Sequence, residues 1–127
     1  MEKASWVMKK GHPMRHFGEP ESAKALCGVA LWTAQVTHSQ GRCCIRCLQS
    51  LKDSEMKLSL EIVSYYCAWG KNWTEDQVAQ FEAYQDEHLQ VSKAIQQQDP
   101  AYVPCDWAQW IKDRQKRAQA AQEVAHA

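Results

Sequence analysis

Residues 43–47 read Cys-Cys-Ile-Arg-Cys, and this run decides how the first part of the chain folds. Cys44 and Cys47 stand at the Cys-x2-Cys spacing, which lets two thiolates bind one metal ion without distorting the backbone. His16 and Cys27 lie upstream, so the full pattern is His16-x10-Cys27-x16-Cys44-x2-Cys47. Three sulfur ligands and one imidazole suit a tetrahedral zinc ion with no open position. The sequence therefore predicts a structural zinc site that holds the first half of the protein together.

The residues beside these ligands favour the same interpretation. Gly28 permits a tight turn after Cys27, and a helix that begins near Cys44 directs backbone N–H groups at the sulfur atoms. Three alternatives stay open: Cys43 in place of Cys44, His12 or His38 in place of His16, and free or disulfide-bonded cysteines without a metal.

Composition and charge limit the class of protein. The chain has 127 residues, of which 45% are hydrophobic and 24% charged, as in a soluble folded domain. Residues 1–52 carry eight Lys or Arg against three Asp or Glu, a net charge of +5. Residues 53–127 carry seven against twelve, a net charge of −5. The neutral total excludes a basic signature over the whole chain, while a local basic face in the first half can still bind nucleic acid.

The chain has no apolar run of about 18 residues, so we expect no transmembrane helix. Its N-terminal residues lack the apolar core of a signal peptide, so we expect a cytoplasmic, intracellular protein. In that compartment six cysteines are metal ligands or free thiols rather than disulfides. Cys67 and Cys105 have apolar neighbours and are expected to be core thiols, which would pair with each other only under oxidising conditions.

We predict an α+β fold. Residues 1–52 form a small N-terminal zinc module of short strands plus a helix, and residues 53–127 form a mainly helical region packed with it as one unit. Residues 6–8 and 14–17 are expected to pair as strands around a Lys-Gly-His-Pro turn. Residues 29–36 are also rich in strand-forming residues.

The first of three helices predicted in the second region covers about residues 54–69. Asp53 or Ser54 can cap its start, and Gly70 stands where a C-terminal cap is expected. Apolar and polar residues also alternate from 56 to 62, so a strand is the competing prediction.

Two further helices are predicted over about residues 74–98 and 106–122. Residues 74–77, Thr-Glu-Asp-Gln, match the capping-box pattern, and apolar residues then recur at steps of three and four. Pro100 ends this helix, because proline disfavours helix in the residue before it. His88 lies on the apolar stripe and is expected to be a hydrogen-bonded core or edge histidine rather than a metal ligand.

A family resemblance rests on Trp6, His16, the triplet Leu26-Cys27-Gly28 and the run Cys44-Ile45-Arg46-Cys47-Leu48. Together they resemble small His/Cys3 zinc-finger proteins, of treble-clef or zinc-ribbon-like form, that phages and mobile elements encode. The resemblance covers about residues 6–52. It implies Zn2+ bound by His16, Cys27, Cys44 and Cys47, and it does not imply a particular task.

Catalytic motifs are missing. A cytidine-deaminase signature needs glutamate two residues after the histidine, where this chain has Gly18, and proline before the cysteine pair, where it has Cys43. We therefore hypothesise a non-enzymatic, zinc-stabilised binding or regulatory protein, of the kind that phages encode, which engages a host protein. The alternatives are a nucleic-acid-binding zinc finger in transcription regulation and an HNH-like nuclease that uses His38.

Two groups of side chains are candidates for partner contact. Basic residues of the first half can bind phosphates. Tryptophans are frequent in interface hot spots, although they can equally pin helices to one another. The candidates are Lys9, Lys10, Arg15, Arg42, Arg46, Trp69, Trp73, Trp107 and Trp110.

Overall fold

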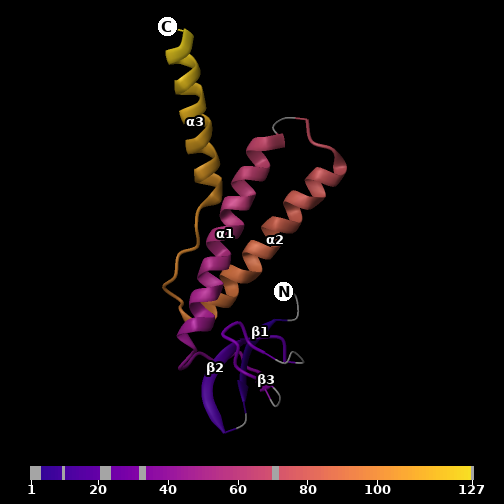
Figure 1. The fold of residues 1–127 in the computed structure, drawn as a ribbon, viewed down its shortest axis with the longest axis vertical. Helices are drawn as coiled ribbons and strands as arrows, with labels where there is room; N and C mark the ends of the chain where they lie inside the picture. Colours follow the sequence, from indigo (N-terminus) through magenta and orange to yellow (C-terminus); the bar gives the residue numbers. More distant parts are fainter. Residues whose placement is uncertain (1–3, 10, 21–23, 32–33, 70–71, 127) are drawn as a thin grey trace.

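The computed structural model describes residues 4–9, 11–20, 24–31, 34–69 and 72–126. It confirms the predicted α+β fold, because a small antiparallel sheet is followed by a mainly helical part (Figure 1). The strands are β1 (Ser5–Lys9), β2 (His12–Gly18) and β3 (Ala34–Val36), and the helices are α1 (Ile45–Trp69), α2 (Glu75–Gln98) and α3 (Trp107–His126).

The sheet has the order β2-β1-β3, with β1 in the centre and antiparallel to both neighbours. The predicted hairpin is confirmed, with Trp6 opposite Phe17 and Val7 opposite His16. Of the described residues in the strand-forming segment 29–36, the last three pair with β1. Successive side chains of a strand point to opposite faces, so Trp6 and Phe17 share one face while Val7 and His16 share the other.

The Trp6 face of the sheet packs on the C-terminal half of α2. Trp6 is fully buried, and its indole Nε1 donates a hydrogen bond to the carbonyl oxygen of Ala94 at 2.6 Å. Its ring meets Phe17 edge-on, with centroids 5.4 Å apart. Val91 and Ile95 complete the contact as buried members of the same core. The sheet thus sits across the lower end of the α1–α2 pair in Figure 1.

A single helix, α1, spans the region where we predicted a boundary near residue 53, and the predicted helix start at Asp53 or Ser54 is wrong. Asp53 does not cap the backbone. Its Oδ1 accepts a hydrogen bond from Gln49 Nε2 at 2.9 Å, an exposed pair one turn apart within the helix. The two predicted regions, residues 1–52 and 53–127, therefore share one continuous helix.

The start of α2 follows the sequence closely. Thr74 Oγ1 accepts a hydrogen bond from the Gln77 backbone at 3.2 Å, and Gln77 Oε1 accepts one from the Thr74 backbone at 2.8 Å. This confirms the capping box.

α3 starts after Asp106, whose Oδ1 accepts a hydrogen bond from the Gln109 backbone at 3.1 Å. α3 runs past its predicted end and projects beyond the end of α1 (Figure 1).

A buried carboxylate, Glu55, connects all parts of the helical region. Its Oε2 lies 2.8 Å from His88 Nε2 on α2 and accepts a hydrogen bond from Ser59 Oγ at 2.7 Å. Its Oε1 accepts hydrogen bonds from the Tyr102 hydroxyl at 2.7 Å and from the Cys105 backbone at 2.9 Å. Glu55 thereby places the segment that leads into α3. His88 is a buried, hydrogen-bonded histidine, as predicted.

Hydrogen bonding keeps Glu55 ionised. Burial by itself raises the pKa of this carboxyl, but the hydrogen bonds from Ser59, Cys105, Tyr102 and His88 outweigh burial and lower the pKa from 4.5 to about 2. A carboxyl with a lowered folded pKa stabilises the fold fully above its unfolded pKa. This stabilisation is lost as the pH falls from about 4.5 through about 2.

We predict that Glu55→Gln lowers the free energy of unfolding by about 3 kcal/mol at pH 7, because it leaves the buried partners of the carboxylate incompletely paired. The difference from the unaltered protein should shrink as the pH falls from 4.5 toward 2. Urea denaturation at several pH values measures both effects. The exposed Glu61 on the same helix supplies the control, since Glu61→Gln should change stability by less than about 0.5 kcal/mol. Equal losses for the two variants would contradict the assigned role of Glu55.

Candidate metal centre

Four side chains from three segments of the chain converge beside the sheet. His16 Nδ1 lies 3.4 Å from Cys27 Sγ and 4.0 Å from Cys47 Sγ. The ligand atoms of His16, Cys27, Cys44 and Cys47 all lie within 4.8 Å of one another. With bonds of about 2.3 Å to sulfur and 2.0 Å to nitrogen, a tetrahedral zinc ion sets its ligand atoms roughly 3.5–3.8 Å apart. The structure thus brings the four predicted ligands together, and they could hold a metal ion.

The turn after β2 returns Cys27 to the strand. The Leu26 backbone donates a hydrogen bond to the Phe17 carbonyl oxygen at 2.9 Å, and the Gly28 backbone donates one to the Ala25 carbonyl oxygen at 2.9 Å. Gly28 has a φ of +90°, in the left-handed region that favours glycine. The glycine predicted to allow a tight turn therefore has the required conformation and brings Cys27 beside His16.

The other two ligands stand at the start of α1. The Cys44 backbone donates a hydrogen bond to the Arg15 carbonyl oxygen at 2.7 Å, which fastens this point to β2. The Leu48 backbone then donates to the Cys44 carbonyl oxygen at 3.0 Å, the first bond of the helix. Cys44 is therefore the N-cap residue, and Cys47 lies in the first turn. Both thiols project from the helix end that carries partial positive charge.

The surroundings of Cys44 and Cys47 shift the pKa values of these two thiols in opposite directions. Burial raises the pKa of Cys44, but the backbone N–H of Cys47, the Cys27 thiol and the backbone N–H of Arg46 outweigh burial and lower it. Cys47 is fully buried, and this burial raises its pKa to about 12. Burial, followed by the charge of Lys9, lowers the pKa of His16 and so favours the neutral imidazole that binds metals. A bound cation would reverse the preference of Cys47, because coordination deprotonates a thiol.

The structure places Cys44, and not Cys43, in the ligand cluster. Arg15 forms a parallel bridge with Cys43, and its backbone donates to the Arg42 carbonyl oxygen at 2.9 Å. Adjacent side chains of such an extended segment face opposite ways. Cys43 therefore lies outside the ligand cluster, as do the exposed His12 and the exposed His38. All six cysteines are free thiols.

The basic candidates for partner contact differ in their surroundings and contacts. Arg42 and Arg46 are exposed. Arg15 anchors a loop, since its Nε donates to the Ser39 carbonyl oxygen at 2.9 Å and its Nη2 to Ser39 Oγ at 2.7 Å. Lys9 and Arg15 line an open hollow of ≈ 800 Å³ at the turn end of the sheet. Lys10 lies outside the described residues.

Two of the tryptophan candidates pack helices together, the alternative that the sequence left open. The Trp73 ring lies 4.9 Å from Phe81 and 5.4 Å from Tyr66, measured between centroids. Phe81 also meets Trp107 at 5.9 Å and so joins α2 to the start of α3. Trp110 instead lines a groove between α1 and α3. The side chain of Trp69 lies outside the described part of the chain.

That groove contains residues that sequence reasoning missed. Arg114 and Arg117 line it together with Leu60, Val63 and Trp110, and its volume is ≈ 570 Å³. The signal was present, because positions 110, 114 and 117 fall on one face of a helix. The position of that face beside α1 depends on the tertiary fold, which the local pattern does not specify.

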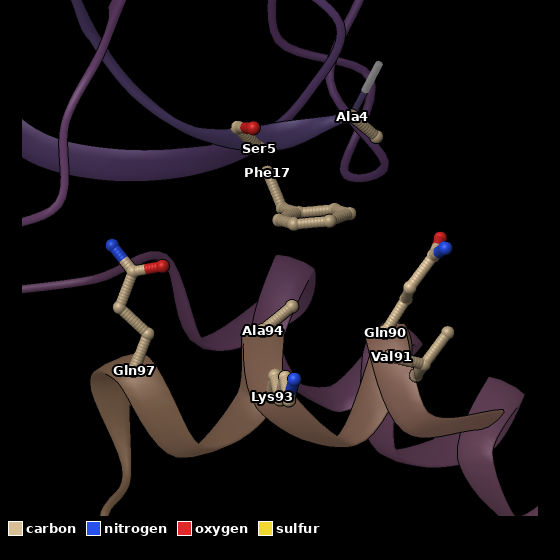
Figure 2. Close-up of a pocket in the computed structure, with 8 residues that line it drawn as sticks. All are labelled: Ala4, Ser5, Phe17, Gln90, Val91, Lys93, Ala94 and Gln97. Atoms are coloured by element: carbon tan, nitrogen blue, oxygen red, sulfur yellow. The ribbon is translucent and has the colours of Figure 1, made fainter. Parts of the chain in front are cut away.

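Two other features resemble reactive sites but lack suitable chemistry. Ser59, His88 and Glu55 form a hydrogen-bonded trio, yet Ser59 and Glu55 both lie against Nε2 of the imidazole, and all three side chains are buried. A pocket of ≈ 260 Å³ lies between the sheet and α2, with Phe17 over Ala94 (Figure 2). The described residues that line it include no carboxylate, histidine or cysteine.

Comparisons of the chain with models of protein families, with curated proteins and with solved structures give no match. Among the described residues, no helix is long and apolar enough to cross a membrane. Inference about function therefore rests on the residues of this chain.

The ligand cluster leads to a prediction with a matched control one residue away. We expect Cys44→Ser to abolish stoichiometric metal binding and to lower the melting temperature by roughly 10 °C or more, because metal binding contributes to folding. Cys43→Ser should keep the metal and melt within a few degrees of the unaltered protein, since Cys43 lies outside the cluster. Native mass spectrometry and thermal melting measure the two quantities. Equal behaviour of the two variants would rule out the assigned ligand set.

Proposed function

We propose that this chain is a non-enzymatic binding protein, that a structural zinc ion stabilises its first part, and that it acts by engaging another protein. The observation that carries the proposal is the closed ligand set of His16, Cys27, Cys44 and Cys47. Catalytic zinc sites use three protein ligands and leave the fourth position to water or substrate, whereas four protein ligands are typical of structural sites. Three thiolates and one imidazole favour zinc over the harder cations Mg2+ and Ca2+.

The protein-binding part of the proposal rests on the groove between α1 and α3. Leu60 at its edge is 53% exposed and adds apolar surface to the groove. Trp110, Arg114 and Arg117 also line this groove. Tryptophan and arginine are the residue types most enriched among interface hot spots. A regulatory or adaptor protein with a metal-stabilised fold fits this combination.

Site-specific photocrosslinking tests the proposal. A photoreactive residue in place of Leu60 should capture a defined protein partner in the cells that contain this chain, and Trp110→Ala should abolish the capture. A photoreactive residue in place of Glu61, which is exposed and lies about 100° further round α1 than Leu60, serves as the control and should capture nothing specific. Absence of capture at Leu60, or equal capture at both positions, would count against a protein-binding role.

A second candidate function, nucleic-acid binding, is supported by the hollow at the turn end of the sheet. Lys9, His12 and Arg15 line it, and its volume of ≈ 800 Å³ is enough for a phosphate with its sugar. The bonds of Arg15 to Ser39 leave Lys9 as its most available cation. The nuclease alternative gains no comparable support, because His38 is exposed and stands apart from the ligand cluster.

Salt dependence distinguishes this second candidate. If the hollow binds phosphates, binding of single- or double-stranded oligonucleotides must weaken steeply with salt, because each contact releases counterions. Lys9→Glu should then remove binding, whereas Lys57→Glu on α1 should not. Fluorescence anisotropy at several salt concentrations measures this. Salt-independent binding, or equal effects of the two substitutions, would eliminate the candidate.

A further inference from the structure

Residues 99–106 connect α2 to α3. The side of the α1–α2 pair on which this connection lies is here called the linker side. Tyr102 of this connection bonds to Glu55 on α1, and its carbonyl oxygen accepts a hydrogen bond from Gln96 Nε2 on α2 at 3.2 Å. Cys105 Sγ lies 3.9 Å from Met56 Sδ on α1. The linker side is therefore bordered by the Met56 edge of α1 and by the Gln96 edge of α2.

Both borders carry exposed apolar side chains. On α1, the exposed Leu60 follows the exposed Met56 at a step of four, and the buried Val63 follows at a further step of three, so the three residues lie along one edge of the helix. On α2, Leu89 lies two turns before Gln96 on the same line, and Val78 lies three turns before Leu89. Exposure is 46% for Met56, 53% for Leu60, 40% for Val78 and 52% for Leu89. Four large apolar side chains half in solvent on one side of a small protein indicate an interaction surface.

The two borders differ in charge. The groove beside α1 carries Arg114 and Arg117. The edge of α2 carries Glu82, which lies between Val78 and Leu89, and Asp86 beside it; both acids are exposed. Among the described residues the ion pairs are Lys52–Asp99 and Glu55–His88, so the two arginines and the two acids have no ion-pair partner in that part of the chain.

We propose that this side is self-complementary and that a second copy of the chain covers it in a two-fold symmetric dimer. The acidic, apolar edge of α2 from one copy lies in the basic, apolar groove between α1 and α3 of the other. Because both surfaces border the same linker side, a two-fold axis lets each copy supply both and closes the assembly. This names the partner of the groove described above and rests on the proposed function for the claim that the groove binds protein.

The size of the surface is adequate for a dimer. The 24 residues of α2 extend over about 36 Å, and two helix diameters measure about 20 Å, which gives roughly 700 Å² per copy. Stable interfaces bury about 800 Å² per partner. The apolar residues provide most of the affinity, and the charges at the edges fix register and partner choice.

The same features disfavour nucleic acid on this side. The α2 edge places Glu82 and Asp86 on the side that also holds the groove arginines. Acidic groups so placed repel a phosphate backbone, which carries regularly repeated negative charge. A protein partner that carries charges of both signs can pair with both the arginines and the acids, so it avoids this repulsion.

Sedimentation equilibrium of the zinc-loaded full chain tests the proposal. We expect a mass twice 14.6 kDa at about 10–100 µM in 0.15 M salt, since interfaces of this size commonly reach micromolar affinity. The double variant Arg114→Glu, Arg117→Glu should raise the dimer dissociation constant about tenfold or more. The control variant Lys112→Glu, Lys116→Glu makes the same change of net charge on the opposite side of α3 and should stay dimeric.

Exchanging the charges of the α2 edge and of the α3 arginines distinguishes loss of the interface from misfolding of a variant. The variant Glu82→Arg, Asp86→Arg should likewise raise the dimer dissociation constant about tenfold or more when it is alone. Mixing it with Arg114→Glu, Arg117→Glu should restore tight association, because a mixed dimer pairs opposite charges. A monomeric unaltered protein, a dissociation constant that Arg114→Glu, Arg117→Glu leaves unchanged, or a mixture that associates no better than either variant alone would each overturn the dimer. A monomer that still captures a foreign protein through Leu60 would overturn the dimer while retaining the proposed function.

Discussion

The convergence of His16, Cys27, Cys44 and Cys47 is the contact on which the rest of the structure depends. The sheet has three short strands, the last of only three residues, and a sheet of this size buries too little apolar surface to be stable alone. The cluster joins β2, the turn after it and the first turn of α1 within 4.8 Å. A metal ion bound here would fasten the sheet to the helix that organises the remainder of the chain.

A second polar cluster, around Glu55, positions the helices that lie farther from the sheet. α1 begins at the ligand cysteines and carries Glu55 about two turns later. Glu55 binds His88 on α2 and both Tyr102 and Cys105 ahead of α3, so one carboxylate sets the positions of the other helices. A buried ionic network of this kind contributes little net stability compared with apolar packing, but a change to one partner is costly.

Local patterns predicted much of this architecture. Ligand spacing predicted the four residues of the His/Cys cluster, Gly28 marked the turn that brings Cys27 to it, and residues 74–77 identified the start of α2. The choice between Cys43 and Cys44 needed the pairing of β2 with the segment before α1, which sequence spacing does not contain. Asp53 was misread because aspartate suits both a cap and an exposed helix position, and only the continuing backbone distinguishes them.

That error also hid the role of Glu55. In a helix predicted to start at residue 54, Glu55 is an acidic residue of the first turn, favourable and exposed. In the continuous helix it lies one turn after Leu51 and one turn before Leu58, both buried, and therefore faces the core. A charged residue on an apolar stripe is the signal that would have revealed it. For the groove, the shared helix face of positions 110, 114 and 117 was a local signal, but its place beside α1 arises from two helices far apart in the sequence.

The central claim is that the four-residue cluster is a closed zinc site, and X-ray absorption spectroscopy at the zinc edge tests it most directly. The account predicts one zinc ion per chain with three sulfur neighbours at about 2.3 Å and one nitrogen neighbour at about 2.0–2.1 Å. A folded protein without metal, or a zinc ion with an oxygen neighbour in place of one of these ligands, would contradict it.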